Sequence, residues 1–213
     1  MRTVEVSDAL QVYMDGLLPD RDPLLARMEE EAHRENIPIV DAHEGALLSL
    51  LVRLARGTRI LELGTATGYS GIWLMRGTEN GTLTTYEMDH ERAARARKNF
   101  AEAGFGDRAI VLEDNAVQGL EKLEGRFDVC FIDLLNSFRS EEITREAFDL
   151  CMEHLDAGGL LMADNALRQG EILDPKTQQD RNVLTYNELV AKHPRLEGLV
   201  IPIRDGLSVA RVK

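Results

Sequence analysis

The stretch RILELGTATGYSGIWLM, residues Arg59–Met75, decides the fold. It starts with an apolar run typical of a buried β-strand and ends with a segment of helical pattern. Between them the chain passes Glu62 and then a turn with glycines at Gly64 and Gly68. Open α/β sheets bind nucleotide-like ligands at such strand–turn–helix junctions, because glycine lets the backbone approach a ligand closely. We therefore expect a ligand site at this turn.

The spacing of the glycines argues against a dinucleotide. The sequence GTATG at positions 64–68 lacks the G-x-G-x-x-G pattern that seats a pyrophosphate on a helix N-terminus. The turn therefore indicates a cofactor without phosphates, and S-adenosylmethionine is the leading candidate. Glu87 ends the next predicted strand, roughly 20 residues further on, where a carboxylate can accept hydrogen bonds from both ribose hydroxyls. Asp114 follows the third strand and is placed to face adenine, although a helix N-cap would have the same pattern.

The composition fits one soluble α/β domain. The 213 residues include 37 acidic and 25 basic side chains, for a formal net charge of −12, and 44% are hydrophobic. This negative balance opposes non-specific binding to nucleic acid or anionic membranes. Cys130 and Cys151 have no CxxC spacing, so we expect neither a disulfide framework nor a zinc site. No signal segment or membrane-spanning stretch is found, and we expect a cytoplasmic protein.

The chain is predicted to form a single domain, residues 1–213, in two parts. Residues 1–56 have helical periodicity and form an N-terminal helical cap. Residues 57–213 alternate between strands and helices, which implies right-handed βαβ units and a parallel sheet with helices on both faces. The expected strands are 59–63, 82–87, 109–112, 127–132, 159–163, 199–203 and 207–212. The expected helices are 8–16, 22–35, 41–56, 69–76, 90–103, 116–123, 141–155 and 178–193, with an irregular loop from 164 to about 177.

The last two predicted strands are separated by Arg204, Asp205 and Gly206. Because Asp-Gly is a strong hairpin signal, the sheet should finish with an antiparallel pair. Class I methyltransferase sheets end in this way, whereas a dinucleotide-binding Rossmann domain usually does not. The predicted fold class is therefore α/β and Rossmann-like, with a mostly parallel seven-stranded sheet, a C-terminal antiparallel hairpin and extra N-terminal helices.

Acidic side chains follow two neighbouring strands of this sheet. Asp133 comes directly after FDVCFI, and Asp164 and Asn165 come directly after LLMA. Neighbouring strand ends lie at one edge of a sheet, beside the glycine turn. Two carboxylates and an amide oxygen, completed by water and substrate, suit a hard cation such as Mg²⁺. The alternative is that Asp133 only binds cofactor and the Asp-Asn pair caps a loop, but two matched strand ends favour the metal site.

Taken together, these motifs resemble the cation-dependent O-methyltransferase family that includes catechol and caffeoyl-coenzyme A O-methyltransferases, and its short bacterial members most. The resemblance covers nearly the whole chain and includes EGALL, ILELGTATGYS, YEMD, FID, ADNALRQG and IPIRDGLSVA. The set is specific, although any one motif alone would be weak. It implies S-adenosylmethionine as cofactor, a divalent cation, a homodimer, and N-terminal helices that cover the substrate mouth.

The resemblance also implies roles for individual residues. Glu62, Gly64 and Ser70 would hold the methionine part of the cofactor, and Glu87 would hold the ribose, with Met88 against the adenine. The full expected cofactor set is Val40, Glu62, Gly64, Thr65, Gly68, Tyr69, Ser70, Glu87, Met88, Asp114, Asn115 and Asp133. The expected metal ligands, for Mg²⁺, are Asp133, Asp164 and Asn165.

One position departs from the family pattern. Family members usually have a lysine three residues after the first metal ligand, where it deprotonates the substrate hydroxyl, but this chain has Asn136. An amide cannot act as a general base at neutral pH. The metal alone can acidify a bound hydroxyl, which is the interpretation we favour. Otherwise His43, Arg139 or Arg168 assists, since an arginine stabilises a developing oxyanion, or the chain binds cofactor without efficient catalysis. The expected catalytic residues are Asp133, Asn136 and Arg168.

The leading functional hypothesis is an S-adenosylmethionine-dependent, metal-assisted O-methyltransferase acting on a small molecule with vicinal hydroxyls, such as a catechol. A second hypothesis is methylation of a hydroxylated wobble uridine in tRNA, as in some short bacterial relatives. The acidic balance disfavours an RNA partner, although Arg168, Lys176 and Arg181 offer a local basic rim. A third is a non-catalytic cofactor-binding protein, suggested by Asn136. A fourth, an NAD-dependent oxidoreductase, is disfavoured by the turn spacing and the closing hairpin.

Overall fold

A seven-stranded sheet in the order β3-β2-β1-β4-β5-β7-β6 forms the middle layer of the molecule. The computed structural model describes residues 6–18 and 22–213. The parallel strands are β1 (Arg59–Leu63), β2 (Thr82–Tyr86), β3 (Ala109–Leu112), β4 (Phe127–Ile132) and β5 (Leu155–Ala163). The antiparallel strands are β6 (Leu196–Ile201) and β7 (Leu207–Val212). The predicted parallel sheet with a closing antiparallel pair is therefore confirmed.

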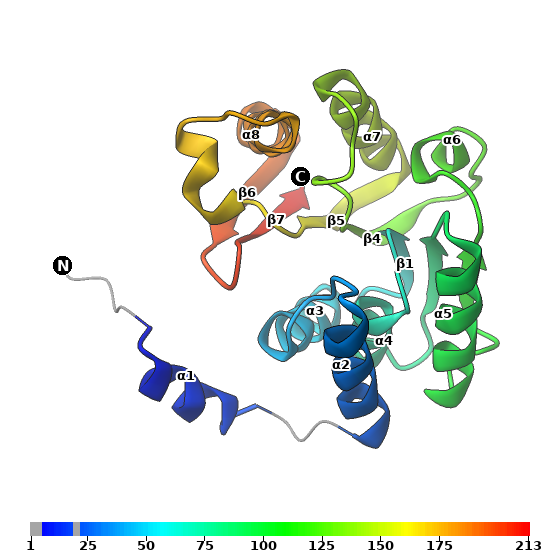
Figure 1. Ribbon diagram of the computed structural model, residues 1–213. Helices are drawn as coiled ribbons and strands as arrows, with labels where there is room; N and C mark the ends of the chain where they lie inside the picture. The colour runs from blue at the N-terminus through cyan, green and yellow to red at the C-terminus, as the bar shows by residue number, and fades with distance from the viewer. Residues whose placement is uncertain (1–5, 19–21) are drawn as a thin grey trace.

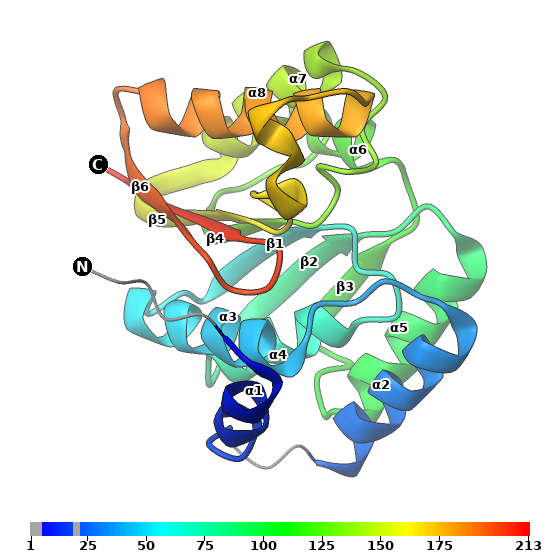
Figure 2. The ribbon, with the colours of Figure 1, turned by 60° about the vertical axis from the view of Figure 1, so that its left-hand side comes forward.

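Helices cover both faces of this sheet (Figure 1). One face packs against α6 (Ala116–Leu120), α7 (Glu141–His154) and α8 (Gln178–Lys192). The other face packs against α3 (Ala42–Ala55), α4 (Tyr69–Arg76) and α5 (His90–Glu102), beside which lies α2 (Pro23–Glu35). The first helix, α1 (Asp8–Asp15), stands clear of the sheet in both views and buries none of its residues (Figure 2). No helix in the described ranges is long and apolar enough to cross a membrane.

Alternate residues of the central strands contribute to two separate apolar cores. Ile60 packs in one core with Leu48 of α3, whereas Leu61 and Leu63 pack in the other with Phe148 of α7. Successive side chains of a strand point to opposite faces, so a strand covered on both sides is apolar almost throughout. Both cores hold β1 and β4 in place, and the strand ends that carry the candidate site residues are fixed with them.

Helix starts agree with the sequence-based boundaries because side-chain caps define them. The Asp41 carboxylate accepts the backbone N–H of Glu44 at 2.9 Å, and Thr177 with Asp180 forms a capping box at the start of α8. Helix α6 is shorter than predicted, ending at Leu120 rather than at 123. The next residues continue as single turns with backbone bonds between positions three apart, such as Lys122 N–H to Gly119 O.

The prediction differs from the structure by more than one residue at other places as well. Strand β5 begins at Leu155, which was expected to end a helix, because Leu155 pairs with Phe127 before a register shift. Strand β6 covers Leu196–Ile201 rather than 199–203, since Pro202 has no N–H for the ladder. The loop after Asp164, expected to be irregular, contains a 3₁₀ segment, η1 (Arg168–Leu173).

Candidate active site

The glycine-rich turn leads the chain from β1 into α4. Gly64 and Gly68 have φ of +92° and +93°, a region that glycine adopts without a Cβ clash. A Cβ on Gly64 would lie 2.8 Å from Leu134 Cδ2 and 3.0 Å from the carbonyl oxygen of Asp133. The turn therefore packs directly against the loop that follows β4, and this loop leaves no room for a side chain at position 64.

Glu62 lies fully buried behind this turn. Its carboxylate accepts hydroxyl hydrogen bonds from Thr65 at 2.7 Å, Ser70 at 2.6 Å and Thr85 at 2.7 Å. Burial raises the pKa of Glu62, and the three hydroxyl donors work in the opposite direction. The expected cofactor residues Glu62, Thr65 and Ser70 thus form one network that shapes the turn, and their contact with a cofactor stays a prediction.

Glu87 follows β2 and touches the same turn from the other side. Its carboxylate accepts the backbone N–H of Ala66 at 3.0 Å and of Asp89 at 2.9 Å. A cavity of about 830 Å³ opens beside it. The walls of this cavity include the expected cofactor residues Gly64, Glu87, Met88, Asp114 and Asn115. Residues predicted from separate motifs, up to 51 positions apart from Gly64 to Asn115, therefore border one space.

Asp114 and Asn115 have different roles at the far wall of this cavity. Asn115 is the N-cap of α6, and its Oδ1 accepts the N–H groups of Val117 at 3.0 Å and Gln118 at 3.2 Å. The capping role that was the alternative for Asp114 therefore belongs to Asn115. Met88 is 64% exposed, and its sulfur lies 3.5 Å from Asn115 Nδ2. Met88 is exposed at the cavity, whereas the Asp114 carboxylate accepts the N–H of Asn115 at 2.7 Å and lies 3.9 Å from Lys122 Nζ.

Two further expected cofactor residues, Val40 and Tyr69, are buried in the core. The Tyr69 hydroxyl donates to Glu29 Oε1 at 2.6 Å, which ties α4 to α2. The Val40 side chain packs with the residues of the α3 and α4 core. Both side chains are committed to packing, which leaves their backbone as the part that can meet a ligand.

Asp133 and Asp164 lie side by side at the carboxyl edge of the sheet. They follow β4 and β5, whose last pair in register is Ile132 with Ala163. Burial and then the neighbouring Asp164 carboxylate raise the pKa of Asp133 well above its usual range. Burial also raises the pKa of Asp164, against the opposing effect of Arg204. The sequence-based prediction that these carboxyl groups share one edge agrees with this placement.

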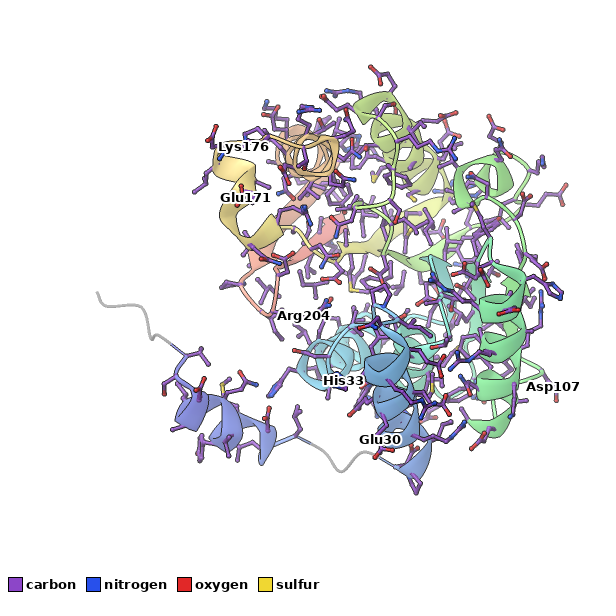
Figure 3. All side chains as sticks on the ribbon, in the orientation of Figure 1. Glu30, His33, Asp107, Glu171, Lys176 and Arg204 are labelled. Carbon is purple, nitrogen blue, oxygen red and sulfur yellow. The ribbon has the colours of Figure 1, made fainter. Side chains whose placement is uncertain are left out.

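The positively charged side chain of Arg204, near the C-terminal end of the chain, lies at this acidic edge. Arg204 lies in the β6–β7 turn, on the side of α3 (Figure 3). Its Nη1 donates to Asp164 Oδ2 at 2.7 Å and to Glu44 Oε2 at 3.4 Å, and its Nη2 donates to the carbonyl of Ile39 at 3.1 Å. Glu44 is fully buried, and burial together with the Asp164 charge raises its pKa to about 9. One guanidinium thus contacts two carboxyl groups, and a third, that of Asp133, interacts with it electrostatically.

The three expected metal ligands do not fit a divalent cation as they are arranged. Asp164 Oδ1 accepts the N–H of Asn165 at 2.5 Å, and its Oδ2 accepts the guanidinium. Asn165 Oδ1 accepts Nδ2 of Asn136 at 2.8 Å. Within residues 6–18 and 22–213, no three His, Cys, Asp or Glu side chains gather as a metal site. The buried oxygens without a partner in these ranges include Glu44 Oε1 and Asn136 Oδ1, which are outside the expected ligand set.

The residues expected to assist catalysis are spread over the site. His43 Nε2 lies 2.7 Å from Asp15 Oδ1, between α3 and α1. Arg168 donates from Nε and Nη2 to Asp180 Oδ1, each at 3.2 Å. Arg139 borders the cavity and forms no ion pair within the described part of the chain. Of these three, only Arg139 has both a place at the cavity and a free charge.

The basic rim expected for an RNA partner is locally neutralised. Besides the pair that Arg168 forms, Lys176 Nζ lies 3.4 Å from Asp174 Oδ2, and Arg181 Nε lies 3.9 Å from Glu141 Oε1. Lys176 lies at the outer margin of the molecule, in the same outlying segment as Glu171 (Figure 3). Each positive charge of the rim is therefore balanced by a carboxylate of the same chain, which weakens the attraction for phosphates.

Glu44 and Arg204 are the residues of this edge that sequence reasoning missed. Glu44 follows the N-cap residue Asp41 by three positions, which resembles a capping box on the helix surface. Arg204 stands in a predicted hairpin turn, where a charged side chain is ordinarily solvated. A usable signal was the sequence motif itself, because Arg204 directly precedes the Asp-Gly pair whose backbone approaches the strand-five loop.

This fold is that of an α/β enzyme, with a cavity at the carboxyl edge of its sheet, where open α/β sheets bind their ligands. The chain belongs to the O-methyltransferase family, whose model matches residues 19–213. A catechol O-methyltransferase of Niastella koreensis is 28% identical over 98% of this chain and 99% of its own length. An O-methyltransferase structure from Klebsiella pneumoniae has a TM-score of 0.86 at 33% identity, covering 96% of both chains. A Bacillus cereus O-methyltransferase in complex with S-adenosylhomocysteine has a TM-score of 0.85 at 28% identity, covering 96% of this chain and 97% of its own. The predicted fold class and enzyme class are thereby confirmed.

Proposed function

We propose that this protein transfers a methyl group from S-adenosylmethionine to a hydroxyl oxygen of a small catechol-like molecule. The observation that supports this most is the cavity of about 830 Å³ between the glycine turn, Glu87 and Asp114. It has a positive-φ glycine turn for close backbone approach, a carboxylate suited to ribose hydroxyls, and no G-x-G-x-x-G cradle for a pyrophosphate.

Two relatives support the choice of cofactor and substrate class. The Bacillus cereus neighbour is described in complex with S-adenosylhomocysteine, the product of methyl transfer from S-adenosylmethionine. The Niastella koreensis relative, which aligns over almost its whole length, is named a catechol O-methyltransferase. Because the alignment includes both the cofactor half and the acidic half of the sheet edge, the same reaction class is the simplest assignment for this chain.

The residues of the chain would mainly position the reactants. When bound, S-adenosylmethionine supplies a methyl carbon whose bond to the sulfonium breaks as a bond to the substrate oxygen forms, leaving a neutral thioether. Glu87 would accept the ribose hydroxyls, and the turn at Gly64 would exclude water from one side of the ligand. The substrate hydroxyl must lose a proton, and we assign to Asp133 the role of the base that accepts it. The backbone carbonyl of Asp133 lies against the Gly64 turn, and its carboxyl group accepts no hydrogen bond from the described residues.

We leave the divalent cation of the sequence-based hypothesis out of this proposal. Both oxygens of Asp164 and the amide oxygen of Asn165 already accept hydrogen bonds within the chain. The tRNA alternative is disfavoured because Arg168, Lys176 and Arg181 each face a carboxylate. A homodimer and a cytoplasmic location remain predictions from the sequence.

A methyl-transfer assay tests the proposal directly. Purified protein is incubated with S-adenosylmethionine that carries a labelled methyl group, and with either catechol or undermodified tRNA. Label in an extracted methyl ether of catechol is the expected result. Label in tRNA instead would move the substrate class to RNA, and label in neither, together with tighter binding of NADH than of S-adenosylhomocysteine, would overturn the proposal.

A binding measurement tests the cofactor half separately. Glu87→Gln should weaken S-adenosylhomocysteine binding about 10-fold or more, equivalent to about 1.4 kcal/mol, because a carboxylate–hydroxyl hydrogen bond is lost. The matched control is Glu91→Gln, an exposed position in the first turn of α5. Equal affinities of Glu87→Gln and wild type in titration calorimetry would remove Glu87 from the cofactor site.

A further inference from the structure

We propose that the Arg204 guanidinium takes the place of the divalent cation at the acidic edge, so that this protein neither binds nor requires a metal there. The statement about catalysis rests on the proposed function, whereas the statement about metal binding does not. The juxtaposition behind it is a single arginine in contact with Asp164 and Glu44, beside Asp133.

The position of Arg204 is built into the fold. The turn that carries it is joined by three hydrogen bonds to the loop that carries the expected metal ligands. These bonds are Ala166 N–H to Gly206 O at 2.8 Å, Leu167 N–H to Asp205 O at 2.8 Å, and Gln169 N–H to Asp205 Oδ1 at 2.5 Å. Because backbone groups of both loops take part, Arg204 cannot leave the acidic edge by moving its turn without breaking them.

The guanidinium donates hydrogen bonds to the carboxylate oxygens that a metal ion would need as ligands. Its Nη1 contacts Oδ2 of Asp164 and Oε2 of Glu44, two side chains that are 3% and 0% exposed. Its Nη2 is held by the carbonyl of Ile39, which fixes the plane of the group. A divalent ion at Asp164 would have to displace the guanidinium and then remain close to it. The repulsion between two cations at this distance opposes that exchange.

Asn136 supports the same inference from the other side of the edge. The family resemblance leads us to expect a lysine at this position, and the chain has a neutral amide that donates to Asn165 Oδ1 at 2.8 Å. The positive charge expected at 136 is thus absent, and a positive charge from 204 is present at the same edge. The amide oxygen of Asn165, which was expected to bind the metal, therefore accepts a hydrogen bond from Asn136 instead.

Replacing Arg204 with glycine tests the role of the guanidinium, because the backbone of Arg204 has a conformation that glycine adopts readily. Arg204 has φ of +49°, in the left-handed region, so Arg204→Gly removes the guanidinium and relieves backbone strain together. Arg56 is a matched control, because it is also an arginine with positive φ, +54°, and forms no side-chain ion pair within the described residues. Arg204→Gln keeps a polar side chain, shorter than that of arginine, and removes the charge together with the Nη contacts, so it serves if the glycine variant does not fold.

The test is Mn²⁺ binding, measured by electron paramagnetic resonance and by the shift of the melting temperature. In wild type and Arg56→Gly we expect no stabilisation by Mn²⁺ at about 1 mM. In Arg204→Gly or Arg204→Gln the freed carboxylates should bind Mn²⁺ at least about 10-fold more tightly than wild type and raise the melting temperature. Adding Asp133→Ala to either variant should remove the gain.

Two results would overturn the inference. One is Mn²⁺ binding by wild type that equals that of the Arg204 variants, and the other is a folded Arg204 variant that gains no Mn²⁺ affinity. In the catechol assay, wild-type methyl transfer should continue in excess EDTA, within about twofold of the untreated rate. A loss of activity on chelation that Mg²⁺ restores would also contradict it. Absence of any turnover would count against the proposed function, while the Mn²⁺ measurements would still decide the role of Arg204.

Discussion

The two halves of the carboxyl edge each bury a glutamate, and they stabilise it by opposite means. Behind the glycine turn, Glu62 accepts three neutral hydroxyl donors, all within 23 positions of it in the sequence. Behind the acidic edge, Glu44 contacts the Arg204 guanidinium from 160 positions away and leaves Oε1 without a partner in the described residues. The first half is a completed local network, whereas the second depends on one long-range cation.

This difference has a physical consequence. Neutral donors hold a buried carboxyl group without adding charge, so the cofactor half keeps its shape when its surroundings change. On the acidic side, the single positive charge of Arg204 is shared among Glu44, Asp133 and Asp164, so it cannot balance three carboxylates. The protonation of these carboxyl groups then depends on their burial and on the charges of their neighbours. We therefore expect the cofactor half to be sensitive to loss of hydrogen bonds and the acidic half to pH.

The largest effect should come from breaking the hydroxyl network. Glu62→Ala leaves the hydroxyls of Thr65, Ser70 and Thr85 buried without their acceptor, and it opens a cavity. We expect a loss of about 3–5 kcal/mol in the free energy of unfolding, measured by urea denaturation. Glu87→Ala, a half-buried carboxylate on the same turn, is the control and should cost about 1 kcal/mol or less. Similar losses for both variants would show that the hydroxyls find other partners.

The second effect concerns pH at the acidic edge. The pKa of Glu44 is about 9 in the folded chain and 4.5 as the reference value, so between these values the folded state keeps a proton that the unfolded state loses. Stability contributed by this group is full below pH 4.5 and falls as pH rises toward 9, by up to about 1.4 kcal/mol per pH unit. The charged groups that face Glu44 are Asp41, Asp133, Asp164 and Arg204.

Glu44→Gln removes this titration while keeping the shape of the protonated side chain. The variant should match wild type near pH 5 and exceed it by about 2–3 kcal/mol near pH 8, in urea denaturation at several pH values. Glu91→Gln, at an exposed position of α5, should follow wild type throughout. A constant difference between Glu44→Gln and wild type across this pH range would refute the assignment of the slope to Glu44.

The same contrast explains what the sequence could predict. The turn from Glu62 to Ser70 is a contiguous motif, so its glycines, its strand and its helix could all be located from local pattern. The edge shared by Asp133 and Asp164 followed from parallel strand order. Arg204 could not be placed there, because its position depends on the β6–β7 turn docking onto the loop after β5. Glu44 was missed because its position fits a helix-capping pattern. Its backbone N–H does donate to the Asp41 carboxylate, but its side chain turns inward to Arg204.

A third prediction tests the junction where the two halves meet. Gly64→Ala would place a Cβ 2.8 Å from Leu134 Cδ2 at φ of +92° and should cost about 2–3 kcal/mol. Gly104→Ala is the matched control, because Gly104 has φ of +79° and nothing within 4 Å of its Cβ position. It should cost only the backbone strain, about 1 kcal/mol. Equal costs in urea denaturation would mean that the β4 loop yields to the new methyl group.

The smallest effect is expected at Asn136. Asn136→Ala removes a hydrogen bond to Asn165, but it also removes the buried Oδ1 that has no partner in the described residues, and these two changes oppose each other. We expect less than about 1 kcal/mol in unfolding and less than about a 10-fold fall in the rate of catechol methylation. Asn80→Ala, at an exposed asparagine outside the lining of the cavity, sets the baseline. A much larger fall in rate at unchanged stability would give the amide a direct part in the reaction. A small fall leaves proton removal to Asp133, because an amide held by Asn165 can orient a neighbour but cannot accept the proton.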